Sequence, residues 1–220
     1  MPLRQSNRQI TYSGSLACRG PARPAHCLLM RSIHNGGERS NQAIRFIMIL
    51  FGSAESGHSY KVRLFLLLAQ IEHEYRCVDL DIPREARPAD FRAASKFGEV
   101  PVVVLDNTSY CQSNAILIAL AERFGKMLGH PNERHLVLEW LSWETNRVGF
   151  SVPNLRHALR WEPQPESVLK FLRERANVDL KTLNDSLTQS DFLVPSGLTI
   201  ADLSLRRIPL LDRASWPLTC

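Results

Sequence analysis

The alternation of hydrophobic and polar residues between positions 48 and 125 predicts short strands separated by helices. The apolar run MILFG at 48–52 predicts a first strand, and a helix is expected over 59–70. A second strand is expected at 75–80, and strand, helix and strand over about thirty residues indicate a parallel pair with a right-handed crossover. The buried face of the helix is predicted from the spacing of Val62, Phe65, Leu66 and Ala69.

The order of the remaining elements in this region predicts the fold class. The expected elements are a short helix at 89–94, strands at 102–105 and 108–111 joined by a turn at Asp106-Asn107, and a helix at 113–124 closed by Gly125. Together the elements read βαβαββα, and Pro101 opens the third strand. This order is the arrangement of the thioredoxin fold, so the chain is predicted to be α/β over 48–127.

Residues 132–220 follow a helical pattern, which predicts an all-helical second domain after a proline-bearing linker at 129–132. Two buried stripes are expected, one at Leu136, Val137, Trp140 and Leu141, and one at Val168, Leu172, Ala176, Leu180, Leu183 and Leu187. Thr199 and Asp202 form a capping box, which predicts that a helix begins there. Arg206 to Pro209 would interrupt this helix, because proline in a helix interior costs roughly 3 kcal/mol. We therefore expect an incomplete helical domain, through truncation or an altered reading frame near residue 205.

The positive charge of the chain is concentrated in its first 47 residues. The sequence has 27 basic and 22 acidic residues and a pI near 9.1. Seven arginines and a single acid, Glu38, lie in residues 1–47, which leaves 20 basic and 21 acidic residues in 48–220. The rest of the chain therefore has no electrostatic signature of nucleic-acid binding.

The composition of residues 1–47 predicts a disordered basic tail, since it is rich in Arg, Ser, Gly and Asn and has no apolar period. Arginine-rich, acid-poor composition is also typical of an organelle transit peptide. A third interpretation is that Met48 is the working start and the tail is upstream translated sequence. We favour this third interpretation, because Met48 begins the first predicted strand.

Several classes of function are excluded or disfavoured by what the sequence lacks. The longest apolar runs, 46–51 and 64–69, are far shorter than the roughly 20 residues of a membrane span. The five cysteines are widely spaced, without zinc-ligand spacing, which favours a reducing cytoplasm and no metal. Cys77 and Cys111 are expected to be small buried hydrophobic residues.

Two features of the stretch KFGEVPVVVLDNTSYCQSNAI suggest a binding site for a peptide. Pro101 cannot donate a hydrogen bond at the strand entrance, which fits either an edge strand or a strand left open for a ligand. Ser113 stands before an apolar helix, where an N-cap is worth about 1 kcal/mol. A helix N-terminus also attracts anions, so capping and anion binding are both compatible with Ser113.

These residues, together with SGHSYKVRLFLLL and AERFG, resemble the N-terminal domain of cytosolic glutathione S-transferases, in particular the bacterial serine-type classes. The match covers nearly all of 48–125. The resemblance implies that glutathione is a co-substrate, that no cofactor or metal is needed, and that the protein is a homodimer. It also implies transfer of the glutathione thiolate to a small hydrophobic electrophile. The alternative is a non-catalytic binding or assembly module on the same fold.

The resemblance also assigns roles to individual residues. A cis Val100-Pro101 bond would present the Val100 backbone to the cysteinyl part of glutathione, and Gln112 and Ser113 would hold the γ-glutamyl carboxylate. The thiolate would accept a hydrogen bond from Ser56. Ser53 and Ser59 are the other candidates, and Ser59 is favoured as the N-cap of the first helix. His58 is interpreted as lining the loop.

Further residues complete the predicted site. Lys96 is predicted to lie near the glycine carboxylate of glutathione, where the neighbouring Glu99 has the wrong sign of charge. No cysteine stands at 56–59, so disulfide chemistry of the glutaredoxin type is disfavoured. The candidates for the wall of the electrophile pocket are Trp140, Trp143, Asn146, Arg147 and Phe150, each of which also suits core packing.

Overall fold

The computed structural model describes residues 48–206, so the expectations for 1–47 and for 207–220 lie outside the described residues. The four strands are β1 (Ile49–Gly52), β2 (Glu74–Cys77), β3 (Val102–Leu105) and β4 (Thr108–Cys111). The α-helices are α1 (Gly57–Leu68), α2 (Ala89–Ala94), α3 (Ser113–Phe124), α4 (Arg134–Asn146), α5 (Val148–Arg160), α6 (Glu166–Leu187) and α7 (Ile200–Leu205). Short 3₁₀ helices lie at Arg84–Ala86 and Pro131–Glu133.

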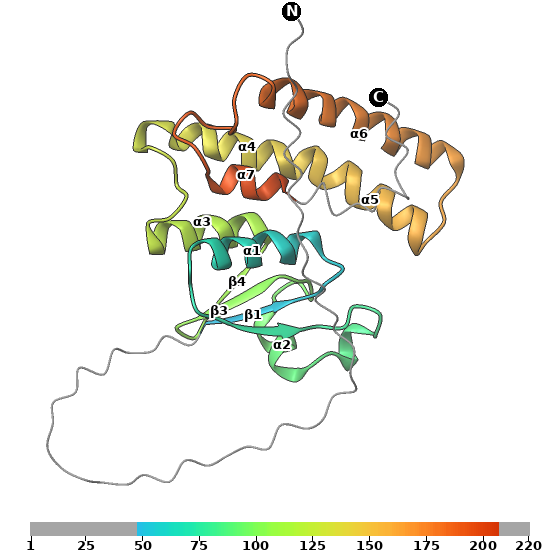
Figure 1. The fold of residues 1–220 in the computed structure, drawn as a ribbon. Helices are drawn as coiled ribbons and strands as arrows, with labels where there is room; N and C mark the ends of the chain where they lie inside the picture. Colours follow the sequence, from blue (N-terminus) through green and yellow to red (C-terminus); the bar gives the residue numbers. More distant parts are fainter. Residues whose placement is uncertain (1–47, 207–220) are drawn as a thin grey trace, which may run out of the picture. The chain divides into compact units, whose positions relative to one another are not determined.

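The strands form one mixed sheet in the order β2-β1-β3-β4 (Figure 1). β1 pairs in parallel with β2, and Leu50 lies opposite Tyr75. β3 is antiparallel to β1, and β4 is antiparallel to β3, which it follows through the turn at Asp106 and Asn107. Both turn residues have positive φ, 50° and 60°, as a tight hairpin requires. The predicted βαβαββα thioredoxin-like order is confirmed.

The sheet is covered on both faces, because successive side chains of a strand point to opposite sides. Leu50 and Val103 belong to the main core, which they share with buried residues of α1 and α3. Phe51 and Val102 belong to a separate cluster with Phe91 of α2. The result is three layers, with α1 and α3 on one face and α2 on the other (Figure 1).

The helical half of the described chain is built onto the α1 and α3 layer. Val137 and Leu141 of α4 and Ile200 and Leu203 of α7 belong to the same buried cluster as the inner residues of α1 and α3. The capping box that begins α7 is present as predicted: the Thr199 hydroxyl accepts from the Ala201 N–H, and Asp202 accepts from the Thr199 N–H. One continuous core therefore links the sheet layer to the helices.

The predicted bounds of α1 and β2 differ from those in the structure. α1 begins at Gly57 and not at 59, because the N-cap is Ser56, whose Oγ accepts from the Ser59 N–H at 3.2 Å. The helix also ends before Gln70, whose φ is 58°. β2 stops at Cys77 and not at 80, since the next residues enter a turn in which the Asp81 N–H donates to Asp79 Oδ1.

Five expectations about capping and burial also need correction. Ser113 does not cap α3: it is the first helical residue, and Gln112 is the cap residue. Cys77 is exposed and Cys111 is half-buried, since β2 and β4 are the edges of the sheet. In the second helical stripe, Val168 and Leu187 are exposed because they lie near the two ends of α6.

Candidate functional site

Three serines are linked by hydrogen bonds at the N-terminus of α1. The Ser59 N–H donates to Ser56 Oγ, the Ser53 N–H donates to Ser59 Oγ, and the Ser56 N–H donates to the Ser53 carbonyl, all within 3.1–3.2 Å. Ser59 is only 1% exposed, and Ser53 is also buried. Ser56 is half-buried, so it is the serine of this group with the most access to a ligand.

The Ser56 hydroxyl accepts a hydrogen bond within the fold and can still donate one to a ligand. As the N-cap it accepts a hydrogen bond, which uses a lone pair of Oγ. A hydroxyl also carries one proton that it can donate. The N-terminus of α1 adds a positive dipole at the same point. Ser56 can therefore cap the helix and donate to an anionic sulfur at once.

The segment before β3 is fixed by several hydrogen bonds. Ser95 Oγ donates to the Glu99 carbonyl and accepts from the Glu99 N–H, both at 3.0 Å. Arg87 Nη1 donates to the Gly98 carbonyl at 2.9 Å. The Val100-Pro101 peptide bond is cis. Within residues 48–206, no hydrogen bond engages the Val100 N–H or carbonyl, so these groups suit pairing with an extended peptide.

The N-terminus of α3 begins from an unusual backbone conformation. Gln112 has φ 68° and ψ 114°, a sparsely populated region that costs on the order of 1–3 kcal/mol in a residue other than glycine. Its side chain makes no capping bond to the helix, so the first N–H groups of α3 are not satisfied by a side chain of the cap residue. The Ser113 hydroxyl lies 3.2 Å from His58 Nδ1 of α1. The end of α3 therefore offers hydrogen-bond donors to an anion.

A small hollow, the site hollow, lies where these segments meet. Its volume is about 70 Å³, which suits one end of a peptide and not the whole of it. Its lining consists of His58, Phe97, Glu99, Val100, Pro101, Cys111, Gln112 and Ser113. The structure thus brings together five of the predicted site residues, from two segments that precede β3 and α3.

Two predicted site residues do not line the site hollow. Lys96 turns toward its neighbour, and its Nζ lies 5.2 Å from the centre of the Phe97 ring. Ser56 lies at the start of α1, two positions before His58, which does line the hollow. The predicted Ser56 hydroxyl is therefore next to the hollow along α1 and not in its wall.

Two contacts in the site were missed by sequence reasoning. His58 belongs to the first turn of α1, and its contact with Ser113 joins residues 55 positions apart. Glu99 accepts a hydrogen bond from Gln112 Nε2 at 3.2 Å. For His58, the available signal in the sequence was its ionisable side chain two positions after the candidate serine. The orientation of Glu99 toward Gln112 had no signal in the sequence.

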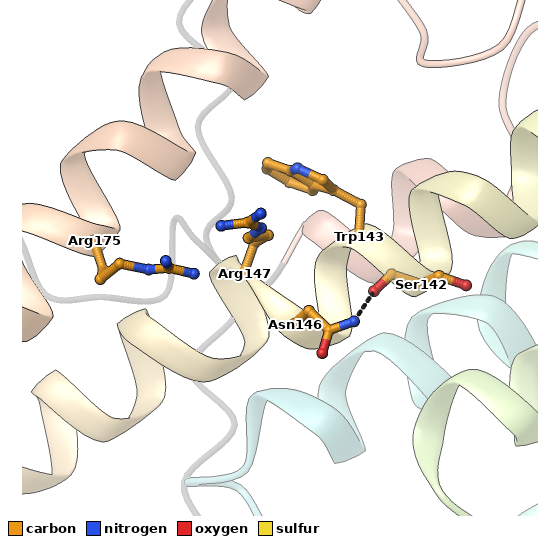
Figure 2. Close-up of a pocket in the computed structure, with 5 residues that line it drawn as sticks. All are labelled: Ser142, Trp143, Asn146, Arg147 and Arg175. Carbon is orange, nitrogen blue, oxygen red and sulfur yellow. Dashed lines mark hydrogen bonds between the residues drawn. The ribbon is translucent and has the colours of Figure 1, made fainter.

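A second hollow, with a volume of about 570 Å³, lies in the helical half and is lined by Ser142, Trp143, Asn146, Arg147 and Arg175. Figure 2 shows the side chains of Arg147 and Arg175 reaching toward one another, with Trp143 beside Arg147. Three candidates for the electrophile wall, Trp143, Asn146 and Arg147, are lining residues here. Trp140 instead packs against the core, edge-on to Trp143 with ring centroids 5.3 Å apart.

The helical half also contacts the loop that carries Ser56. Arg156 of α5 donates from Nη1 to the Glu55 carbonyl at 2.9 Å and from Nη2 to Glu55 Oε2 at 2.6 Å. The Glu55 carboxylate is largely exposed, so its ion pair with Arg156 adds little to stability. The hydrogen bond to the carbonyl fixes the backbone beside Ser56.

A buried polar cluster supports the ends of both site helices. Lys61 of α1 is fully buried and donates to Glu144 of α4 at 3.2 Å and to Asn114 of α3 at 2.6 Å. Asn114 Nδ2 in turn donates to Glu144 Oε2 at 2.9 Å and to the Leu141 carbonyl at 3.0 Å. Because Asn114 follows Ser113, this cluster fixes the N-terminus of α3 relative to α1.

Within residues 48–206, no three His, Cys, Asp or Glu side chains come together as ligands for a metal ion. None of the helices described there combines the length and the apolar character needed to cross a membrane.

Comparison with known proteins links this arrangement to one family. Residues 55–123 match the model of the glutathione S-transferase N-terminal domain. No curated protein matches the sequence. Among solved structures, a possible glutathione S-transferase from Rhodopseudomonas palustris is 31% identical, with a TM-score of 0.60, over 72% of this chain and 79% of that chain.

Two further solved structures are similar to the chain. A glutathione S-transferase from Xanthobacter autotrophicus Py2 is 30% identical, with a TM-score of 0.64, over 77% of this chain and 87% of that chain. The glutathione transferase URE2P8 from Phanerochaete chrysosporium, solved with oxidized glutathione, has a TM-score of 0.67 over 75% of this chain and 78% of that one. Its 21% identity supports the fold alone. From the two bacterial relatives and the domain match, the chain belongs to the glutathione S-transferase family.

Proposed function

We propose that the protein binds glutathione at the site hollow, which takes one end of the peptide, and transfers the glutathione thiolate to a small hydrophobic electrophile. The observation that carries the proposal is the convergence of the open Val100 backbone and the N-terminus of α3 on one hollow, beside the N-terminus of α1. Val100 would pair with the cysteinyl backbone of glutathione, and Ser113 would hold its γ-glutamyl carboxylate. No metal or further cofactor is required.

Ser56 would activate the thiol. A free cysteine thiol has a pKa of about 8.5, so little of it is ionised at neutral pH. A hydroxyl donor and a helix N-terminus stabilise the thiolate and lower the pKa of the thiol. The thiolate sulfur then attacks the electrophilic carbon, a C–S bond forms, and the leaving group departs with its electron pair. The proton released from the thiol goes to solvent.

The electrophile would occupy the second hollow or its margin in the helical half. Trp143 supplies an apolar surface there, and Arg147 and Asn146 supply polar groups. Binding pockets of this kind are mostly apolar with few polar groups, so they select a class of ligand more than a single compound. The family relationship leads us to include a homodimer in the proposal, which sedimentation velocity would test.

The proposal is tested by titrating glutathione into the full-length protein in a calorimeter, beside the Ser113→Ala variant. We expect wild-type binding in the micromolar to millimolar range and weaker binding by the variant, followed by turnover with a panel of electrophiles. Circular dichroism of both proteins is the control for folding. A cooperatively folded wild-type protein that gives no heat of binding would remove the basis of the proposal.

A non-catalytic glutathione-binding module is the second candidate. It is favoured by one observation: Ser56 is absent from the lining of the site hollow. Under this alternative, glutathione binds, but no member of the electrophile panel is conjugated. Turnover that is unaffected by Ser56→Ala would instead keep the enzyme and reject Ser56 as the activating group.

A further inference from the structure

Two arginine side chains meet in the second hollow. Arg147 lies between α4 and α5, Arg175 lies on α6, and Figure 2 shows their guanidinium groups reaching toward one another. In the described part of the chain, 48–206, neither guanidinium forms an ion pair or a hydrogen bond with a protein group. Two like charges therefore approach each other with no acid of the chain to offset their repulsion.

Other arginines of the same helices have acidic partners. Arg156 of α5 pairs with Glu55 at 2.6 Å, and Arg173 of α6 pairs with Glu166 at 2.7 Å. Arg175 is only two positions from Arg173 and has no such partner among residues 48–206. The pair in the second hollow is thus a local excess of positive charge.

The acids closest to Arg175 along α6 are engaged elsewhere. Glu174 pairs with Lys170 at 3.9 Å. Asp179, about one turn further on, is buried, and its Oδ2 accepts from Ser151 Oγ at 3.3 Å. No acid is among the five residues that line the hollow, so an anion that enters it meets no carboxylate in its wall.

Two helix ends also meet at Arg147, which ends α4 and begins α5. The C-terminus of a helix carries a partial negative charge and the N-terminus a partial positive charge. The two dipoles offset each other at this point. The sign of the charge in the hollow is therefore decided by the two guanidinium groups.

The rest of the hollow suits a flat apolar group. The half-buried Trp143 side chain supplies an aromatic surface, and Ser142 and Asn146 supply uncharged polar groups. Asn146 Nδ2 donates to the Ser142 carbonyl at 3.3 Å, which fixes the amide on α4. The volume of about 570 Å³ is in the range of sites for small molecules.

This combination indicates the chemical class of the ligand. A guanidinium presents its donors in a planar fork that matches a carboxylate or a phosphate. We infer that the second hollow binds small organic acids, with the acidic group between Arg147 and Arg175 and a flat apolar part against Trp143. An electrophile that occupies this hollow is then an organic anion and not a wholly hydrophobic compound. That last step rests on the proposed function, whereas binding of the acid needs no glutathione.

The test compares 2-naphthoate with the neutral 2-naphthamide, which has the same ring system. Both are titrated without glutathione into full-length wild type, Arg147→Gln and Arg175→Gln in a calorimeter. We expect wild type to bind the acid at least about fivefold more tightly than the amide, since a hydrogen bond to a charged group is worth more than a neutral one. Each variant should lose most of this preference and keep the affinity for the amide. Added salt should weaken binding of the acid alone.

Arg173→Gln is the matched control, because it removes the same charge from the same helix at a position outside the hollow. It should bind both compounds as wild type does. Trp143→Phe should weaken both compounds alike, since it reduces the apolar surface and leaves the arginines in place. Circular dichroism of each variant is the control for folding.

Three results would overturn the inference. Equal affinity of wild type for the two compounds would show that the arginines do not select a charge. A wild type that binds neither compound would show that the hollow takes no such ligand. A loss in Arg173→Gln as large as that in Arg175→Gln would place the effect in the net charge of α6. None of these results changes the titration with glutathione, which tests the proposed function separately.

Discussion

A single hydroxyl at the start of α1 is central to the proposed chemistry. Ser56 accepts from the Ser59 N–H and so satisfies one of the unpaired donors of the first helical turn. The same group would donate its proton to the glutathione sulfur. A substitution at this position therefore changes two quantities, the stability of the fold and the rate of turnover, and the choice of replacement can separate them.

We predict that Ser56→Ala lowers the free energy of unfolding by about 1 kcal/mol, because the N-cap is lost, and reduces turnover at neutral pH. Ser56→Asp should retain the stability of wild type, since aspartate is an equally good N-cap, but should not recover turnover. Its carboxylate has no proton to donate and repels a thiolate. Urea denaturation and a conjugation assay measure the two effects. Turnover in Ser56→Asp at the wild-type rate would mean that Ser56 serves as a cap alone.

At this scale the sequence predicted the residue types of the site better than their contacts. Val100, Pro101, Gln112 and Ser113 were identified through the family resemblance, and the structure brings them together. The contact between His58 and Ser113 depends on the packing of α1 beside α3. A contact that spans 55 positions leaves no trace in local patterns of the sequence.

At the scale of elements, local chemistry predicted some boundaries well. The strands at 102–105 and 108–111 and the helices at 89–94 and 113–124 have the predicted bounds. Turn residues and the αL cap at Gly125, φ 61°, mark these ends within the sequence itself. The ends of α1 and β2 were misjudged because they are set by hydrogen bonds of Ser56 and Asp79, polar residues that suit caps and turns equally well.

α7 depends strongly on its capping box. Asp202 Oδ2 accepts from the N–H and the hydroxyl of Thr199, at 2.8 and 2.9 Å, and its Oδ1 accepts from the Leu193 N–H at 2.9 Å. Asp202 therefore fixes the start of the helix and the loop that leads to it. Because α7 contributes Ile200 and Leu203 to the main core, a loss at its cap should affect the whole core.

We predict that Asp202→Ala lowers the free energy of unfolding by about 2 kcal/mol, because three donors lose their acceptor. Asp185→Ala is the control: it removes an exposed ion pair with Lys181 on α6 and should change stability by less than about 0.5 kcal/mol. Urea denaturation followed by circular dichroism measures both. Equal stability of the two variants would contradict the role assigned to Asp202.

At the scale of the whole described chain, one buried ion pair joins the sheet layer to the helices. Lys61 and Glu144 are 0% and 3% exposed and lie 83 positions apart in sequence. A lysine between apolar residues of an amphipathic helix is ordinarily assigned to its solvent face, so its burial could not be predicted from the sequence. Asn114 completes the cluster, since it forms a hydrogen bond with each of the two partners.

We predict that Lys61→Met lowers the free energy of unfolding by roughly 3–5 kcal/mol, because it leaves the Glu144 carboxylate buried without its counter-ion. The double variant Lys61→Met/Glu144→Leu should recover most of this loss, since no unpaired charge remains. Denaturation followed by tryptophan fluorescence reports on the helices through Trp140 and Trp143. A double variant as unstable as Lys61→Met would show that the pair contributes stability beyond the balance of charge.

The contact between Arg156 and Glu55 has a consequence for recombining members of this family. Arg156 belongs to the helical half, and its partner lies 101 positions earlier, one residue before Ser56. A chimera can take its thioredoxin-like half from this chain and its helices from a relative. Such a chimera keeps Ser56 but loses the hydrogen bond from Arg156 that fixes the backbone beside it. The donor must supply a cation at the position of Arg156, or the crossover must move both residues together. Segment exchange with this chain therefore has to keep this pair of positions together and not only follow a domain boundary.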